Sequence, residues 1–155
     1  SVAGMRSIYD AFLSGEDYVK TVGLPFGMNV MGYSRSFLES SVNTHRNDIL
    51  ETGWGRIFDA SMLKTVEMGL IEDEKLRFTL DYEEDYQFFK VLIEKAGDMI
   101  FGISDEDIVN IVLKEKMCRY NQEISKQYWE TFKKLQKQEI EKSIESDPVE
   151  HEERS

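Results

Sequence analysis

The sequence predicts an α/β fold in which a mixed sheet is flanked by helices, with helices dominating the C-terminal half. In the first part of the chain, short apolar runs bounded by glycine or proline alternate with helical patterns. The second part is filled by longer amphipathic patterns with capping residues. A chain of 155 residues can bury a substantial core, and helices layered on a sheet are the natural way to build one.

The first 42 residues predict two helices and two strands. Apolar residues recur at helical spacing before Gly15, which stands where a helix C-cap is expected. Gly23 and Gly27 enclose a turn between two strand-like runs, and Ser34 is placed to cap the helix that follows. The expected elements are a helix at 5–14, strands at 18–22 and 29–33, and a helix at 35–42.

The pattern is unclear over residues 43–61 and then resumes. Leu76, Phe78 and Leu80 alternate as in a strand, and Ser104 with Asp107 resembles a capping box in which Asp replaces the usual Glu. The remaining expected elements are an edge strand at 62–68, a strand at 76–80, and helices at 83–96, 104–116 and 122–143.

Charge and cysteine content narrow the class of protein. The formal net charge of −11 argues against nucleic-acid binding, which needs clustered Lys and Arg. One domain is expected over residues 1–144, followed by a disordered tail at 145–155, because the end of the chain is dense in carboxylates. The single cysteine, Cys118, suits the cytoplasm, and no apolar run is long enough for a membrane span.

Asp81 is the strongest candidate for chemistry. The alternating run at 76–80 places its carboxylate at the carboxyl end of a strand, where open α/β sheets hold ligands and metals. An Asp before a helix also caps free backbone N–H groups, which is its commoner role. Both interpretations remain open from the residues alone.

Four segments, in order, resemble the C-terminal half of the cytidylyltransferases of the spore-coat polysaccharide type, relatives of the enzymes that make CMP-activated acidic sugars. They are Gly15-Glu16-Asp17-Tyr18-Val19, Pro25-Phe26-Gly27-Met28-Asn29-Val30, Arg77-Phe78-Thr79-Leu80-Asp81-Tyr82-Glu83-Glu84-Asp85, and Asn121 after a helix and a connector. Together they cover most of residues 8–125.

The resemblance implies a nucleotide-diphospho-sugar transferase-like fold and a reaction in which CTP and a sugar give a CMP-sugar and pyrophosphate. It implies that Asp81 helps to hold a catalytic Mg²⁺, a cation that prefers hard oxygen ligands and few protein carboxylates. Asp85, one helical turn further on, either supports that metal site or stabilises the helix N-terminus. Arg46 is expected to contact the sugar or a phosphate.

Departures from the family pattern are equally informative. The family's N-terminal half, with its basic glycine-containing loop and first metal-binding Asp, has no counterpart here, and Phe26, Asn29 and Met31 stand where acids are common. We therefore expect the chain to be inactive by itself. One alternative is a non-catalytic assembly or binding module that pairs as a homodimer or with a missing N-terminal half, and the 122–143 helix is a candidate contact. The other alternative is a glycosyltransferase that uses a nucleotide-sugar donor.

Overall fold

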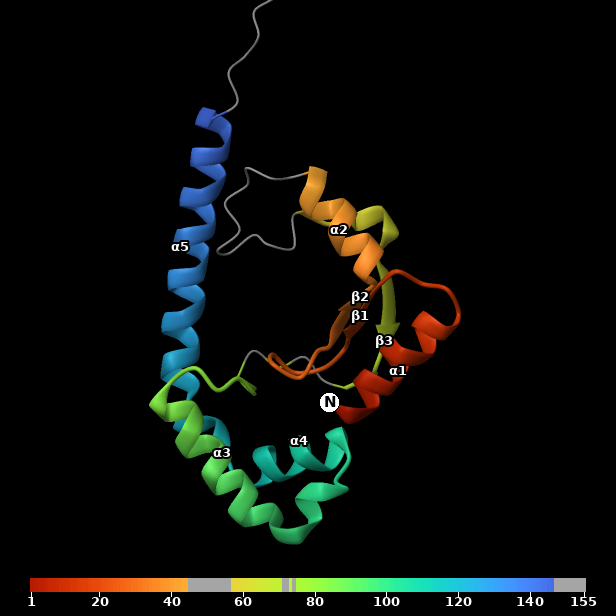
Figure 1. The fold of residues 1–155 in the computed structure, drawn as a ribbon. Coiled ribbons are helices and arrows are strands. Elements are labelled where there is room, and N and C mark those ends of the chain that lie inside the picture. The colour runs from red at the N-terminus through yellow and green to blue at the C-terminus, as the bar shows by residue number, and fades with distance from the viewer. Residues whose placement is uncertain (45–56, 71–72, 74, 147–155) are drawn as a thin grey trace, which may run out of the picture.

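A computed structural model describes residues 1–44, 57–70, 73 and 75–146 of the chain, and the other residues lie outside this description. The described part is an α/β fold, rich in helix, with one small sheet. Figure 1 shows the long helix α5 along one side with α3 and α4 at its foot, while the sheet lies with α1 and α2 on the other side. The α/β class predicted from the sequence is therefore confirmed.

The elements follow the predicted order. The α-helices are α1 (Val2–Leu13), α2 (Arg35–Thr44), α3 (Glu83–Ala96), α4 (Asp105–Lys114) and α5 (Gln122–Ser146). The strands are β1 (Tyr18–Val22), β2 (Met31–Tyr33) and β3 (Lys64–Glu67). Short 3-10 helices lie at η2 (Ala60–Met62), η3 (Gly97–Phe101) and η4 (Met117–Tyr120).

The described strands form a mixed sheet with the order β2-β1-β3. β1 pairs antiparallel with β2, so that Val19 lies opposite Gly32, and parallel with β3, so that Val19 also lies opposite Lys64. Gly32 lets α1 approach the sheet, because a Cβ there would lie 2.6 Å from a methyl carbon of Ile8. Both outer strands are shorter than predicted.

The predicted strand at 76–80 is wrong. This segment makes one isolated parallel bridge, between Phe26 and Arg77, in which the Phe78 N–H donates to the Phe26 carbonyl at 2.8 Å. The Arg77 carbonyl accepts instead from the Asn121 side chain at 3.1 Å, so a side chain takes the place of a neighbouring strand. Leu80, which was expected to alternate with Leu76 and Phe78 along this strand, is 64% exposed.

The helix ends show how local sequence sets the boundaries. Ser104 is the N-cap of α4, and its hydroxyl accepts from the Asp107 N–H at 3.1 Å, as predicted. α4 ends before 116 because Lys116 adopts the left-handed conformation, with φ of 53°. α5 includes residues 145 and 146, which we predicted to belong to the tail, and the rest of the tail lies outside the described residues.

Two clusters of buried apolar side chains form the core. The larger joins the turn after β1, the 76–78 segment, α3, α4 and η4, through Leu24, Met28, Leu76, Phe78, Phe88, Leu92, Val109, Val112 and Met117. The smaller lies between β1 and α2, through Tyr18, Phe37, Ile57 and Phe58. Cys118 packs against the larger cluster, and burial raises the pKa of its thiol, as expected of a structural cysteine. No helix in the described part of the chain is both long and apolar enough to cross a membrane.

Candidate functional site: a buried arginine beside an exposed carboxylate

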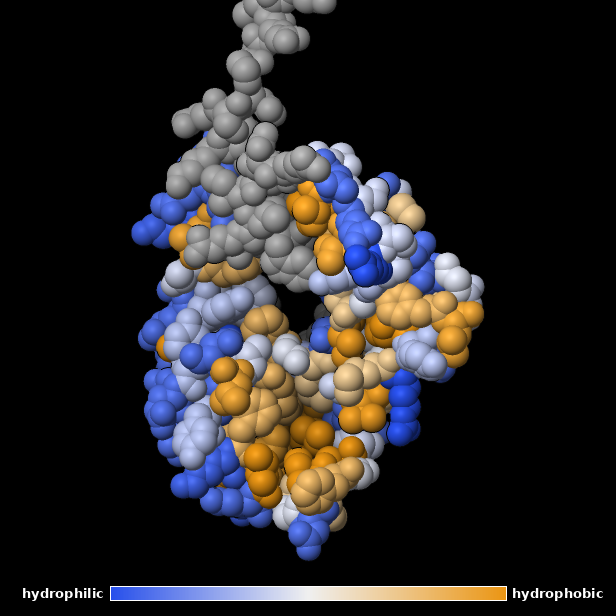
Figure 2. Space-filling view, viewed as in Figure 1, coloured by the Kyte–Doolittle hydropathy of each residue, from blue (hydrophilic) through white to orange (hydrophobic). Residues whose placement is uncertain are grey.

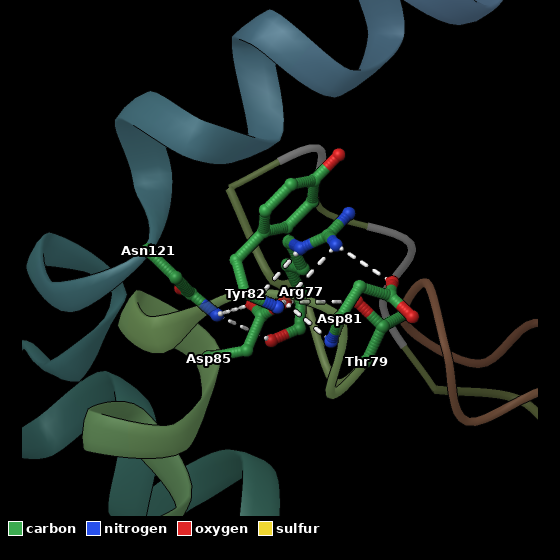
Figure 3. Close-up of polar contacts among 6 residues, drawn as sticks. All are labelled: Arg77, Thr79, Asp81, Tyr82, Asp85 and Asn121. Atoms are coloured by element: carbon green, nitrogen blue, oxygen red, sulfur yellow. Dashed lines mark hydrogen bonds and ion pairs between the residues drawn. The ribbon is translucent and has the colours of Figure 1, made fainter.

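Residues from three of the four family-like segments meet at one point. Arg77 lies in the extended segment before α3, Asp85 in the first turn of α3, and Asn121 immediately before α5. Figure 3 shows their side chains turned toward one another, with Asp81 beside them. Phe26, from the segment that contains Pro25 and Gly27, joins them through its backbone bridge to Arg77.

Arg77 and Asp85 form a fully buried ion pair. Both side chains have 0% relative exposure. Arg77 donates from Nε to Asp85 Oδ1 at 3.0 Å and from Nη2 to Asp85 Oδ2 at 3.1 Å, a bidentate arrangement. Removing one partner of such a pair leaves an uncompensated buried charge, so each residue fixes the position of the other.

Each carboxylate oxygen of Asp85 accepts at least one further hydrogen bond besides the one from Arg77. Oδ1 accepts from Asn121 Nδ2 at 3.0 Å, while Oδ2 accepts from the backbone N–H groups of Asp81 at 3.1 Å and Tyr82 at 3.3 Å. Burial alone would raise the pKa of Asp85, but the hydrogen bonds from Arg77, Asn121 and the Asp81 amide hold that pKa below its ordinary value. The carboxylate is therefore ionised and stabilises the start of α3.

Asp81 is not the N-cap of α3. The N-cap is Tyr82, and the capping carboxylate is Asp85, which accepts from the backbone at the helix start. Asp81 Oδ2 instead accepts from Arg77 Nη2 at 2.9 Å, and its side chain remains 55% exposed. Its Oδ1 makes no hydrogen bond or ion pair with any residue that the structure describes. One carboxylate oxygen of Asp81 is thus held by a rigid partner and the other is available to a ligand.

Three aromatic rings surround the guanidinium of Arg77. Its central carbon lies 4.8 Å from the ring centroid of Tyr128, 5.5 Å from that of Tyr82 and 5.6 Å from that of Phe26. Nη1 is buried and has no hydrogen-bond partner among the described residues. Cation–π attraction to the rings offsets part of this missing hydrogen bond.

The residues described here do not form a complete metal site. Within the described ranges, no group of three or more His, Cys, Asp or Glu side chains is placed to hold an ion. The Asp85 oxygens are occupied by protein donors, which leaves Asp81 as the accessible carboxylate of the pair. Arg46, predicted to contact the sugar or a phosphate, lies outside the described residues.

The sequence prediction named Arg77 only as part of a family-like segment and assigned it no role. In the structure Leu76, Arg77 and Phe78 are all buried. The available signal was an arginine between two apolar residues expected in the core, because a buried cation requires a carboxylate partner. Asn121 gave no signal apart from the family resemblance.

In comparisons with known proteins, no family model, no curated protein and no solved structure matches this chain.

Proposed function

We propose that the chain is the C-terminal portion of a cytidylyltransferase-like protein that makes a CMP-sugar from CTP and a sugar. One observation carries the proposal. A single buried arginine, Arg77, contacts residues of family-like segments from Phe26 to Asn121, which are up to 95 positions apart in the sequence. Of the two carboxylates that pair with Arg77, only Asp81 is exposed. Asp81 is thus the carboxylate of this network that a ligand in solvent can reach.

In this proposal Asp81 donates one oxygen to Mg²⁺ bound to the phosphates of the nucleotide. Mg²⁺ commonly takes one or two protein carboxylates and completes its coordination with water and phosphate oxygens. When bound, the cation would neutralise charge on the triphosphate. The chain's own contribution is positional: Asp85 holds Arg77, and Arg77 fixes the orientation of Asp81. A single accessible carboxylate is too little for tight binding, so the isolated chain is expected not to turn over CTP.

The test is paramagnetic broadening in the amide NMR spectrum, with Mn²⁺ in place of Mg²⁺ and CTP present. We expect the amides around Asp81 to broaden first, and the effect to disappear in Asp81→Asn. Asp98→Asn is the matched control, because Asp98 is an exposed carboxylate in η3, away from the network. Equal broadening in the wild type and Asp81→Asn would remove the metal role, whereas release of pyrophosphate from CTP by the isolated chain would overturn its expected inactivity.

A second candidate, a non-catalytic assembly module, is favoured by the surface of α1. Four large apolar side chains follow one face of this helix and remain exposed: Val2, Met5, Tyr9 and Leu13, at 59%, 55%, 63% and 71%. Ile8, on the side of the helix next to this stripe, is buried and packs on the sheet. Figure 2 shows apolar surface over α1. Exposed apolar stripes of this kind commonly mark protein–protein contacts, and sedimentation that is indifferent to CTP and Mn²⁺ would favour this candidate.

A further inference from the structure

A cleft of about 850 Å³ lies between α5, the turn after β1 and the residues before Arg77. Its volume falls in the range of small-molecule binding sites. Asp81 and Asp85 are not among its described lining residues, so the cleft is separate from the metal proposal.

One wall of the cleft is a single face of α5. Six residues on this face recur at spacings of three or four and so point the same way: Gln122, Ser125, Lys126, Trp129, Glu130 and Lys133. The cleft therefore begins at the N-terminus of a 25-residue helix, the end at which backbone N–H groups and the helix dipole favour an anion.

Among the described residues that line the cleft, lysines outnumber carboxylates although the chain is acidic. They are Lys75, Lys126 and Lys133 against Asp73 and Glu130, in a protein of formal net charge −11. Lys75 and Lys133 form no ion pair with any described residue. Lys126 pairs with Glu123 at 2.8 Å, but both side chains are largely exposed, so this pair yields readily to a ligand.

An aromatic wall lies beside the lysines. The ring centroids of Phe26 and Trp129 are 4.8 Å apart, and both residues line the cleft together with Leu24. Trp129 keeps 36% of its surface exposed. A flat or apolar ring of a ligand can lie on this wall, and the amide of Gln122 also lines the cleft.

We propose that this cleft binds a small organic phosphate. The phosphate lies among the lysine ammonium groups, and the ring that carries it lies on Phe26 and Trp129. The cleft brings lysine side chains and an aromatic surface together, and its volume of about 850 Å³ is large enough for both parts of such a ligand. The ring is either a base or a sugar, and the experiment separates these two sources.

The experiment is calorimetric titration of the whole chain with cytidine monophosphate, ribose 5-phosphate and inorganic phosphate. We expect both organic phosphates to bind more tightly than inorganic phosphate. Lys133→Gln and Lys75→Gln should each weaken this binding about ten-fold or more, the effect of losing one charged hydrogen bond. Lys134→Gln is the matched control, because Lys134 is the next residue on α5, is also exposed, and does not line the cleft.

The titrations show whether the ring on the aromatic wall is a base or a sugar, and they can also refute the cleft as the binding site. Tighter binding of the nucleotide than of ribose 5-phosphate, with a change in Trp129 fluorescence in a Trp54→Phe background, places a base on the aromatic wall. Equal affinities for cytidine monophosphate and ribose 5-phosphate place the sugar ring on the aromatic wall. If inorganic phosphate binds equally well, the ring part of the proposal fails, and if Lys134→Gln weakens binding as much as Lys133→Gln, the cleft is not the site. Asp81→Asn should leave the titration unchanged, so this proposal and the metal role of Asp81 fail independently.

Discussion

The charge of Arg77 is fully buried and depends on the carboxylate of Asp85. Replacing Asp85 by Asn keeps the size of the side chain but leaves the guanidinium without a buried counter-charge. We expect the free energy of unfolding to fall by about 3–5 kcal/mol, measured by urea denaturation. Asp98→Asn, on an exposed carboxylate, should change it by less than about 0.5 kcal/mol. A similar small change for Asp85→Asn would mean that the ion pair is not formed in solution.

The same carboxylate predicts a pH dependence. The pKa of Asp85 is lowered in the folded state, so its contribution to stability is fully present above the unfolded pKa of about 3.9 and is lost as the pH falls through the folded pKa. The difference in unfolding free energy between wild type and Asp85→Asn should therefore shrink below about pH 4, by at most about 1.4 kcal/mol per pH unit. Urea titrations of both proteins from pH 6 down to pH 3 measure this difference in unfolding free energy. A difference that grows as the pH falls would mean that the folded pKa is raised.

At the scale of elements, Gly27 controls how closely the turn after β1 approaches the segment before α3. Its φ is +89°, and a Cβ there would lie 2.4 Å from the Phe78 carbonyl oxygen. Gly27→Ala should therefore cost about 2–4 kcal/mol of unfolding free energy, from backbone strain and overpacking together. It should also increase hydrogen exchange at the Phe78 amide, because that amide donates to Phe26 across the bridge.

Substitutions at two other glycines separate the cost of backbone strain from the cost of overpacking. Gly15 has a φ of +93°, and a Cβ there would have no atom within 4 Å, so Gly15→Ala should incur only the conformational cost, roughly 1–2 kcal/mol. Gly102 has a φ of −138° and equally open surroundings, and Gly102→Ala should be nearly neutral. If Gly27→Ala cost no more than Gly15→Ala, the close approach to Phe78 would be absent in solution.

The elements that the sequence predicted well are those whose signals are local. The Ser104 cap and the helical periodicity of 83–96 depend on neighbours within one or two turns, and both predictions are confirmed. The 76–80 segment has the alternation of a strand, but its hydrogen bonds are decided by Phe26 and Asn121, residues that are distant in sequence. For the candidate site, the sequence identified Asp81 and Asp85 but not the arginine between them, because burial of Arg77 depends on aromatic rings from three separate segments.

At the scale of the whole molecule, α5 is joined to the rest of the chain partly by aromatic contacts. Phe26 lies 4.8 Å from Trp129 and 5.7 Å from Tyr128, measured between ring centroids. The sequence prediction offered this helix as a subunit contact, but its Tyr128 and Trp129 rings pack against Phe26 within the chain. The largest continuous exposed apolar stripe on a helix of the described fold lies instead on α1, and this changes where association between copies is expected.

We predict that the isolated chain self-associates through α1, because water is excluded from Val2, Met5, Tyr9 and Leu13 when two such faces meet. Tyr9→Glu places a charge at the centre of this stripe and should weaken association at least about ten-fold in sedimentation equilibrium, a change of about 1.4 kcal/mol. Ala3→Glu adds the same charge to the same helix at an exposed position off the stripe, and should leave association unchanged. Because Tyr9 is itself 63% exposed, neither variant should lower the urea midpoint of the monomer appreciably. Equal sedimentation of wild type and Tyr9→Glu would assign any self-association to another surface and would leave the assembly candidate without its supporting observation.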